Sequence, residues 1–334
     1  MNSKERLEAR LQGKPVDKIP NLNIAMALVA KCAGVSYREY AQDYRKLVEG
    51  NLICVEKFGF DSVSAISDPM REASAFGAAV TFPENAVPYS LPELFHDGYD
   101  RSLLKTGSPY DSERTLDRIK AVELLHEKAG KDFPVIGWVE GVLAECADLR
   151  GVSELMFDLA AGEEYLSELM ELVHAQQKAF AKAQVDAGAD FIGVGNAVAS
   201  LIGPSLYEEY AFAYDKAIVD YVHSLGAKVK LHICGNITAL LPQLREVAPD
   251  ILDLDWMVDY KTAADMMQGA PISVNGNLDP VAVMLSGTVE EVEQKTRECI
   301  AAGNQTSLLA AGCEVPADTP EENLLAMDRL LYLS

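Results

Sequence analysis

The 334-residue sequence is poor in positive charge and has no long hydrophobic run. Its 29 Lys and Arg stand against 51 Asp and Glu, a formal net charge of −22 at pH 7. This balance disfavours nucleic acid as a partner, because an acidic surface repels a polyanion. No apolar stretch approaches the ~18 residues of a membrane span, and the charged N-terminus lacks the apolar core of a signal peptide. The sequence therefore predicts a cytoplasmic protein without a membrane segment.

Cysteine is also sparse, and its six positions are scattered along the chain. A reducing cytoplasm would keep such cysteines as thiols, so a disulfide framework is not expected. A metal site or a catalytic role is the expected use of any cysteine that is not simply a core residue.

What the sequence does contain is a regular alternation of strand and helix patterns. Short apolar strand patterns centre near residues 22, 62, 136, 191, 231, 253, 273 and 308, and each is followed by helical spacing. Eight such units predict an α/β fold, a single-domain (β/α)₈ TIM barrel over residues 19–334, preceded by a helical extension over residues 1–18. The alternative is an open doubly wound sheet, but its phosphate-binding G-x-G-x-x-G is absent.

Several local features of this barrel are predicted as well. Residues 37–58 and 152–187 each show continuous helical spacing, and residues 75–110 form a long loop rich in Gly, Pro and aromatics. Thr288 with Glu291, and Thr319 with Glu322, have the spacing of capping boxes at the last two helices.

The strand pattern K-V-K-L-H-I-C-G-N at residues 228–236 carries the clearest chemical signal. Residues two apart on a strand point to the same face, so His232 and Cys234 lie side by side. Cys313 also follows a short apolar run, but it is 79 positions away from Cys234, far beyond a zinc-knuckle spacing. The alternative interpretation is a core histidine beside two buried free cysteines.

A barrel would remove the difficulty of that spacing, because all strands end on one face, where active sites of this fold are built. On this rim the sequence places Asp68, Glu140, Asn196, His232, Cys234, Asp255, Asn275, Asn277 and Cys313. One histidine and two cysteines form a catalytic type of zinc set, which leaves a position for substrate. Asp255 is the candidate for a switchable fourth ligand, and the other carboxylates and amides could equally cap helices or loops.

Several motifs resemble those of the uroporphyrinogen decarboxylase superfamily over nearly the whole chain. They are S-D-P-M-R-E-A at 67–73, G-W-V-E-G-V-L-A-E at 137–145, H-I-C-G-N at 232–236, D-W at 255–256, G-N-L-D-P at 276–280 and G-C-E-V-P-A-D-T-P at 312–320. Within that superfamily the His-x-Cys and distant Cys resemble the zinc motif of the corrinoid-dependent methyltransferase branch, typified by methylcobamide:coenzyme M methyltransferases. The arginine-rich motif that grips substrate carboxylates in true decarboxylases has no counterpart in I-A-M-A-L-V-A-K-C-A-G at 24–34.

The resemblance implies Zn²⁺ on His232, Cys234 and Cys313. The catalytic candidates come from their predicted place on the rim and are Asp68, Glu140, Asn196, Asp255 and Asn277. It also implies methyl transfer between a corrinoid (methylcobalamin) and a small-molecule thiol acceptor or methoxylated donor. No cobalamin-binding D-x-H-x-x-G run occurs, consistent with a corrinoid carried by a separate partner protein. Two alternatives stay open, a tetrapyrrole decarboxylase and a non-catalytic corrinoid or tetrapyrrole binding scaffold. A homodimer is one of the oligomeric states that the sequence allows.

Overall fold

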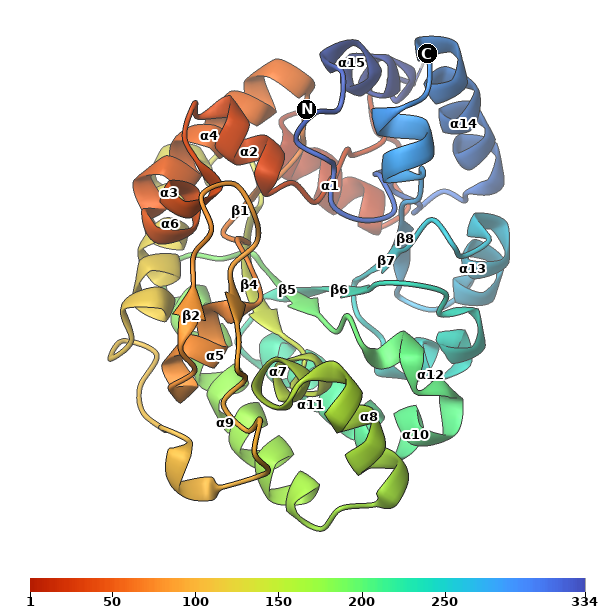
Figure 1. The fold of residues 1–334 in the computed structure, drawn as a ribbon. Coiled ribbons are helices and arrows are strands. Elements are labelled where there is room, and N and C mark those ends of the chain that lie inside the picture. Colours follow the sequence, from red (N-terminus) through yellow and green to blue (C-terminus); the bar gives the residue numbers. More distant parts are fainter. Residues whose placement is uncertain (334) are drawn as a thin grey trace.

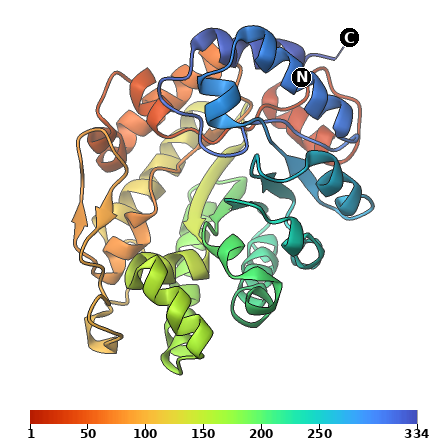
Figure 2. The ribbon, with the colours of Figure 1, turned by 45° about the vertical axis from the view of Figure 1, so that its right-hand side comes forward.

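The protein forms a parallel sheet that is curled into a barrel and surrounded by helices (Figures 1 and 2). The structure is a computed structural model that describes residues 1–333. Six strands pair in the order β1-β4-β5-β6-β7-β8, all in parallel. They are β1 (Val63–Ser64), β4 (Val135–Glu140), β5 (Phe191–Gly195), β6 (Lys228–Ile233), β7 (Ile251–Leu254) and β8 (Ser273–Asn275).

Two further segments close the ring through single parallel bridges. Leu308 pairs with Asn275 of β8, Leu309 pairs with Asn21, and the amide of Asp61 donates to the carbonyl of Asn21 just before β1. The predicted strands near residues 22 and 308 are therefore present as isolated bridges. The eight-unit barrel predicted from the alternating pattern is confirmed.

The outer layer consists of helices whose apolar faces pack on the sheet or on neighbouring helices. They are α1 (Ser3–Leu11), α2 (Ala27–Cys32), α3 (Tyr37–Gln42), α4 (Tyr44–Phe58), α5 (Met70–Phe76), α6 (Glu113–Ala129), α7 (Val142–Arg150), α8 (Val152–Ala161), α9 (Tyr165–Asp186), α10 (Gly203–Tyr210), α11 (Phe212–Ser224), α12 (Leu241–Val247), α13 (Tyr260–Met267), α14 (Val289–Ala302) and α15 (Glu321–Leu330).

Three local predictions need correction. The helix predicted over residues 37–58 breaks at Asp43, whose extended backbone ends α3 and whose side chain caps α4. The helix predicted over residues 152–187 breaks at Gly162, which has a φ of 69°. The predicted 75–110 loop contains a hairpin of β2 (Val80–Thr81) and β3 (Tyr89–Ser90).

The two predicted capping boxes have different outcomes. Thr288 and Glu291 form the reciprocal pair of hydrogen bonds at the start of α14, as predicted. At α15 the N-cap residue is Pro320, and the buried Thr319 hydroxyl has no partner in the described structure. The prediction of the second capping box is therefore wrong. Thr319 and Glu322 have the residue types of the motif, but the N-cap residue is Pro320, one position later.

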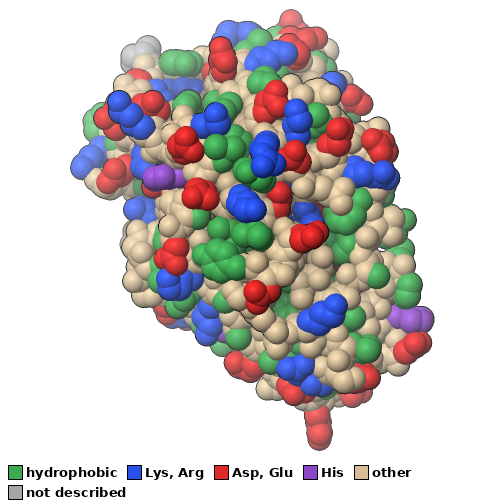
Figure 3. Space-filling view, turned by 90° about the vertical axis from the view of Figure 1, so that its left-hand side faces the viewer, with side chains coloured by type: hydrophobic (Ala, Val, Ile, Leu, Met, Phe, Trp, Pro, Cys, Tyr) green, Lys and Arg blue, Asp and Glu red, His purple; other side chains and the backbone are tan. Residues whose placement is uncertain are grey.

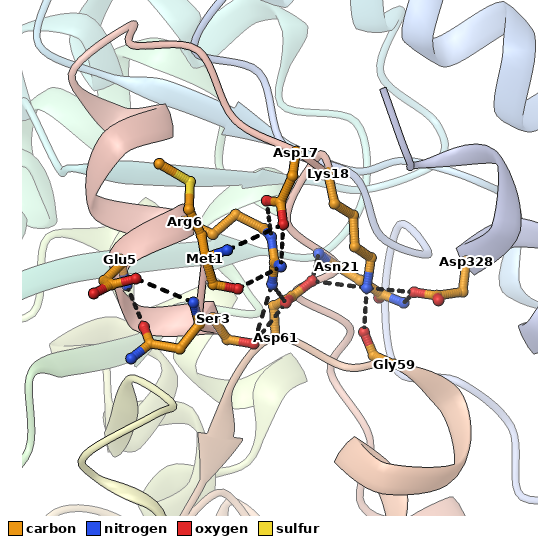
Figure 4. A network of polar contacts seen from close by, with 11 residues as sticks. Met1, Ser3, Glu5, Arg6, Asp17, Lys18, Asn21, Gly59, Asp61 and Asp328 are labelled. Atoms are coloured by element: carbon orange, nitrogen blue, oxygen red, sulfur yellow. Dashed lines mark hydrogen bonds and ion pairs between the residues drawn. The ribbon is translucent and has the colours of Figure 1, made fainter. Parts of the chain in front are cut away.

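Helix α1 covers the end of the barrel at which the strands begin. Leu7 packs among residues of the barrel interior that include Leu22, Ile136 and Phe191. Arg6 donates to Asp61 and Asp17, and Lys18 binds Asp61, Asp328 and the carbonyl of Gly59 (Figure 4). The boundary predicted after residue 18 stays a prediction.

The surface mixes charges of both signs. On the face shown in Figure 3, acidic and basic side chains are interspersed, and hydrophobic side chains gather in small groups. Among the described residues, no helix has both the length and the apolar character needed to cross a bilayer.

Candidate metal centre

His232 belongs to a row of residues that lie side by side across the sheet. The register pairs Glu140 with Gly195, Gly195 with His232, His232 with Asp253, and Asp253 with Asn275. Register partners in parallel strands point to the same face. The row thus holds polar side chains at one level of the barrel, where β4, β5 and β6 end or approach their ends.

The structure brings His232, Cys234 and Cys313 together. The His232 Nε2 atom is 3.2 Å from Cys234 Sγ and 3.7 Å from Cys313 Sγ, and the two sulfur atoms are 3.9 Å apart. With Zn–S bonds of ~2.3 Å and Zn–N bonds of ~2.0–2.1 Å, tetrahedral zinc separates two sulfurs by about 3.8 Å and nitrogen from sulfur by about 3.6 Å. The three atoms have the spacing of one face of such a tetrahedron, so this cluster could bind zinc.

The thiols of this cluster differ in acidity. The hydrogen bond with Cys234, followed by contact with His232, lowers the pKa of Cys313 to about 4, although burial opposes the shift. The shared proton and burial raise the pKa of Cys234. Because the thiolate is the form that binds metal, Cys313 is ready to act as a ligand at neutral pH.

Asp253 lies beside the second ring nitrogen of His232. Its Oδ2 atom is 3.8 Å from His232 Nδ1, a buried nitrogen without a hydrogen bond in the described structure, and it also pairs with Lys230. Its Oδ1 atom accepts a 2.7 Å hydrogen bond from Asn275. A carboxylate that accepts a hydrogen bond from the second ring nitrogen orients a ligating histidine, and Asp253 is the carboxylate beside this nitrogen.

A cavity of about 200 Å³ opens directly at the cluster. Its surface is mostly apolar, although acidic, basic and sulfur-containing side chains also line it. Its lining residues include Ile24, Met26, Ile66, Asp68, Arg71, Trp138, Glu140, Gly195, His232, Cys234, Cys313 and Glu314. Gly193 makes room for one wall, since a β-carbon there would lie 2.0 Å from the ring of Trp138.

Two predicted carboxylates, Asp68 and Glu140, line this cavity. Asp68 is paired with Arg114 and accepts from the Ser67 hydroxyl. Burial would raise the pKa of Asp68, but Arg114 and Arg71 outweigh burial and lower it. Glu140 is different: burial raises its pKa to about 7 despite a 2.8 Å contact with Arg71.

The other predicted catalytic residues do not line the cavity. Asn196 is fully buried and donates to both carboxylate oxygens of Asp215. Asp255 accepts from the amides of Gly235 and Met257, so it fixes the loop beside Cys234. Asn277 donates to the carbonyls of Asp255 and Val258.

The sequence reasoning did not single out Asp253, Lys230 or Arg71. The strand alternation could have pointed to Asp253 and Lys230. Each lies two positions before a residue that was selected, and so on the same strand face: Asp253 before Asp255, and Lys230 before His232. Arg71 lies within the S-D-P-M-R-E-A motif, but nothing in its local pattern predicts that its guanidinium reaches Glu140 across 69 positions.

Known proteins are similar to this chain over most of its length. Methylcobamide:CoM methyltransferase MtbA of Methanosarcina mazei is 33% identical over 97% of this chain and 96% of its own. A uroporphyrinogen decarboxylase of Trichodesmium erythraeum is 27% identical over 86% of this chain and 82% of its own. The solved structure of a methyltransferase from Methanosarcina mazei covers 98% of this chain and 97% of its own, with a TM-score of 0.87 at 23% identity. The sequence model of the uroporphyrinogen decarboxylase (URO-D) family matches residues 2–330, and the chain therefore belongs to this family.

Proposed function

We propose that the protein is a zinc-dependent methyltransferase that moves a methyl group between a corrinoid and a small molecule. The small molecule is either a thiol acceptor or a methylated donor such as a methoxylated compound. The observation that carries this proposal is the triangle of His232 Nε2, Cys234 Sγ and Cys313 Sγ at a small cavity. Similarity to methylcobamide:CoM methyltransferases over 97% of the chain supports it.

In this proposal His232, Cys234 and Cys313 hold the metal, and Asp253 keeps the imidazole oriented. Zinc, when bound there, supplies a Lewis acid that makes a thiol easier to ionise near neutral pH or polarises a leaving oxygen. Three protein ligands leave one position open for an exchangeable ligand. Ile66 and Trp138 give the cavity apolar walls, and apolar walls weaken the binding of water at such a position.

The corrinoid is proposed to arrive on a separate protein that docks over the rim. Apolar side chains are exposed in the loops that follow β5, β7 and β8: Leu201 is 62% exposed, Trp256 48%, Met257 50% and Val281 56%. Exposed apolar groups at one end of a barrel are typical of a surface that another protein covers. Asp255 remains the proposed exchangeable fourth ligand, which would have to leave the two amides that it now accepts from.

The size of the cavity argues against the tetrapyrrole decarboxylation for which the family is named. Pockets for drug-sized ligands measure roughly 300–1,000 Å³. The cavity at the cluster is about 200 Å³. It suits a small substrate rather than a macrocycle with several carboxylates.

Metal analysis with matched cysteine variants tests the proposal. Protein purified without chelator should contain about one zinc per chain, and Cys313→Ala should lose both the zinc and the demethylation of methylcobalamin with a thiol. Cys299→Ala is the control, because Cys299 is also half-buried but contacts Asn277 and not the cluster. Absence of zinc after reconstitution, or full activity of Cys313→Ala, would overturn the proposal.

A further inference from the structure

Four carboxyl groups gather beside the mouth of the barrel where β4 meets α5 and α7. They are Glu72 on α5, Glu140 at the end of β4, and Glu145 and Asp148 on α7. The first three are at most 8% exposed. Arg71 is the cation that contacts two of them, at 3.2 Å from Glu72 Oε2 and 2.8 Å from Glu140 Oε1. One guanidinium cannot neutralise both carboxylates.

The two oxygens of Glu140 have different surroundings. Oε1 accepts the hydrogen bond from Arg71. Oε2 has no hydrogen bond within residues 1–333 and lies over Gly195, where an added β-carbon would come within 3.0 Å of it. Glu140 and Gly195 both line the cavity that also contains the sulfur atoms of Cys234 and Cys313. Glu140 therefore has one oxygen that is held and one that is free to take a proton at the cavity.

The groups around Glu140 favour its protonated form. Its backbone amide donates to Glu72 Oε1 at 2.9 Å, which holds a second carboxylate close by. Both carboxyl oxygens of Glu145 are buried without a partner in the described structure. Burial raises the pKa of Glu140 to about 7 and also raises the pKa values of Glu72, Glu145 and Asp148, while Arg71 opposes the shifts.

We infer that Glu140 is the proton acceptor for a thiol substrate that enters this cavity. The S–H bond of the thiol breaks, an O–H bond forms on Glu140 Oε2, and the electron pair stays on sulfur as a thiolate. The inference rests on the proposed methyl transfer and narrows it to a thiol acceptor. Placing the new proton on Glu140 also relieves the competition between Glu72 and Glu140 for Arg71.

Proton counting distinguishes this role from a structural one. Zinc-loaded protein is titrated with 2-mercaptoethanol in a calorimeter at pH 6 and pH 8, in two buffers of different ionisation enthalpy. At pH 8 Glu140 of the thiol-free protein is ionised and can accept the thiol proton, so the number of protons released to the buffer should be close to zero. At pH 6 Glu140 is already protonated, so about one proton should be released to the buffer per thiol bound. Glu140→Gln should release about one proton at both pH values.

The control is Glu154→Gln, the same substitution at an exposed position of α8, which should behave as the unmodified protein. The role of Glu140 would be overturned if the unmodified protein released about one proton at both pH values, or if Glu140→Gln and the unmodified protein released the same number of protons. Either result would leave the proposed function intact. No thiol binding in any of the three proteins would overturn this inference and would leave the methylated donor as the substrate in the proposed function. If Glu140→Gln fails to fold, the pH dependence of the unmodified protein decides alone.

Discussion

Buried charged groups are well paired at one end of the barrel and poorly paired at the other. At the end covered by α1, Asp61 accepts from Ser3, Arg6 and the amide of Asn21 and also contacts Lys18, so both its oxygens are satisfied (Figure 4). At the mouth, Arg71 contacts only two of the four carboxyl groups, Glu72 and Glu140, and the carboxyl group of Glu145 has no partner among the described residues. Paired buried charges fix a structure, whereas poorly paired ones shift their pKa values and mark sites of chemistry.

This contrast predicts that removing one charge changes the free energy of unfolding differently at the two ends. Asp61→Asn leaves Lys18 and Arg6 buried with less compensation, and we expect it to lower the free energy of unfolding by about 3–5 kcal/mol. The measurement is urea unfolding followed by circular dichroism, with zinc content determined on the folded fraction. Zinc content per folded chain should not change, because the network lies at the end opposite to the cluster.

A matched control for Asp61 is Asp186→Asn in α9, where Asp186 and Lys182 form an exposed i,i+4 pair. The urea midpoint of this variant should equal that of the unmodified protein, since exposed pairs contribute little. An equal loss of stability in the two variants would remove the distinction between the buried network and a surface ion pair.

Asp253 lies between the two ends, and its replacement should affect metal binding as well as stability. In Asp253→Asn the ring nitrogen of His232 loses its carboxylate neighbour, and zinc affinity should fall about 10–100-fold. Chelator competition at pH 7 measures this affinity. Because Lys230 would also lose its counter-charge, the double variant Lys230→Met/Asp253→Asn serves as control: it should regain stability but not zinc affinity. Unchanged zinc affinity in both variants would show that Asp253 does not orient His232.

Removal of one carboxyl group at the mouth should increase stability. Burial raises the pKa of Glu145 well above its ordinary value of 4.5. The folded protein therefore retains a proton that the unfolded chain releases above pH 4.5, and stability falls as the pH rises beyond that value. Glu145→Met should raise the free energy of unfolding at pH 8 by about 1–3 kcal/mol, with a smaller gain at pH 4.5. Urea midpoints at the two pH values check this, and a loss of stability at pH 8 would contradict it.

Much of the barrel could be predicted because it depends on local patterns. The alternation of apolar runs with helical spacing locates the strands, and the Thr288 and Glu291 pair marks the start of α14. The errors occurred where one residue overrides a continuing pattern, as Gly162 does in a left-handed conformation and Pro320 does at a helix start. Hydrophobic spacing carries no information about such single-residue interruptions.

In the candidate site, too, some features follow from local sequence patterns and others do not. The sequence by itself determined that His232 and Cys234 share a strand face, because side chains alternate along a strand. Only the tertiary structure decided that Cys313 lies 3.9 Å from Cys234 and that Arg71 reaches Glu140, because these contacts depend on how the ends of distant strands meet when the sheet closes. It also decided that Glu140 faces the cavity with a raised pKa while Asn196 turns to Asp215, since burial and neighbouring charges exist only in the folded chain.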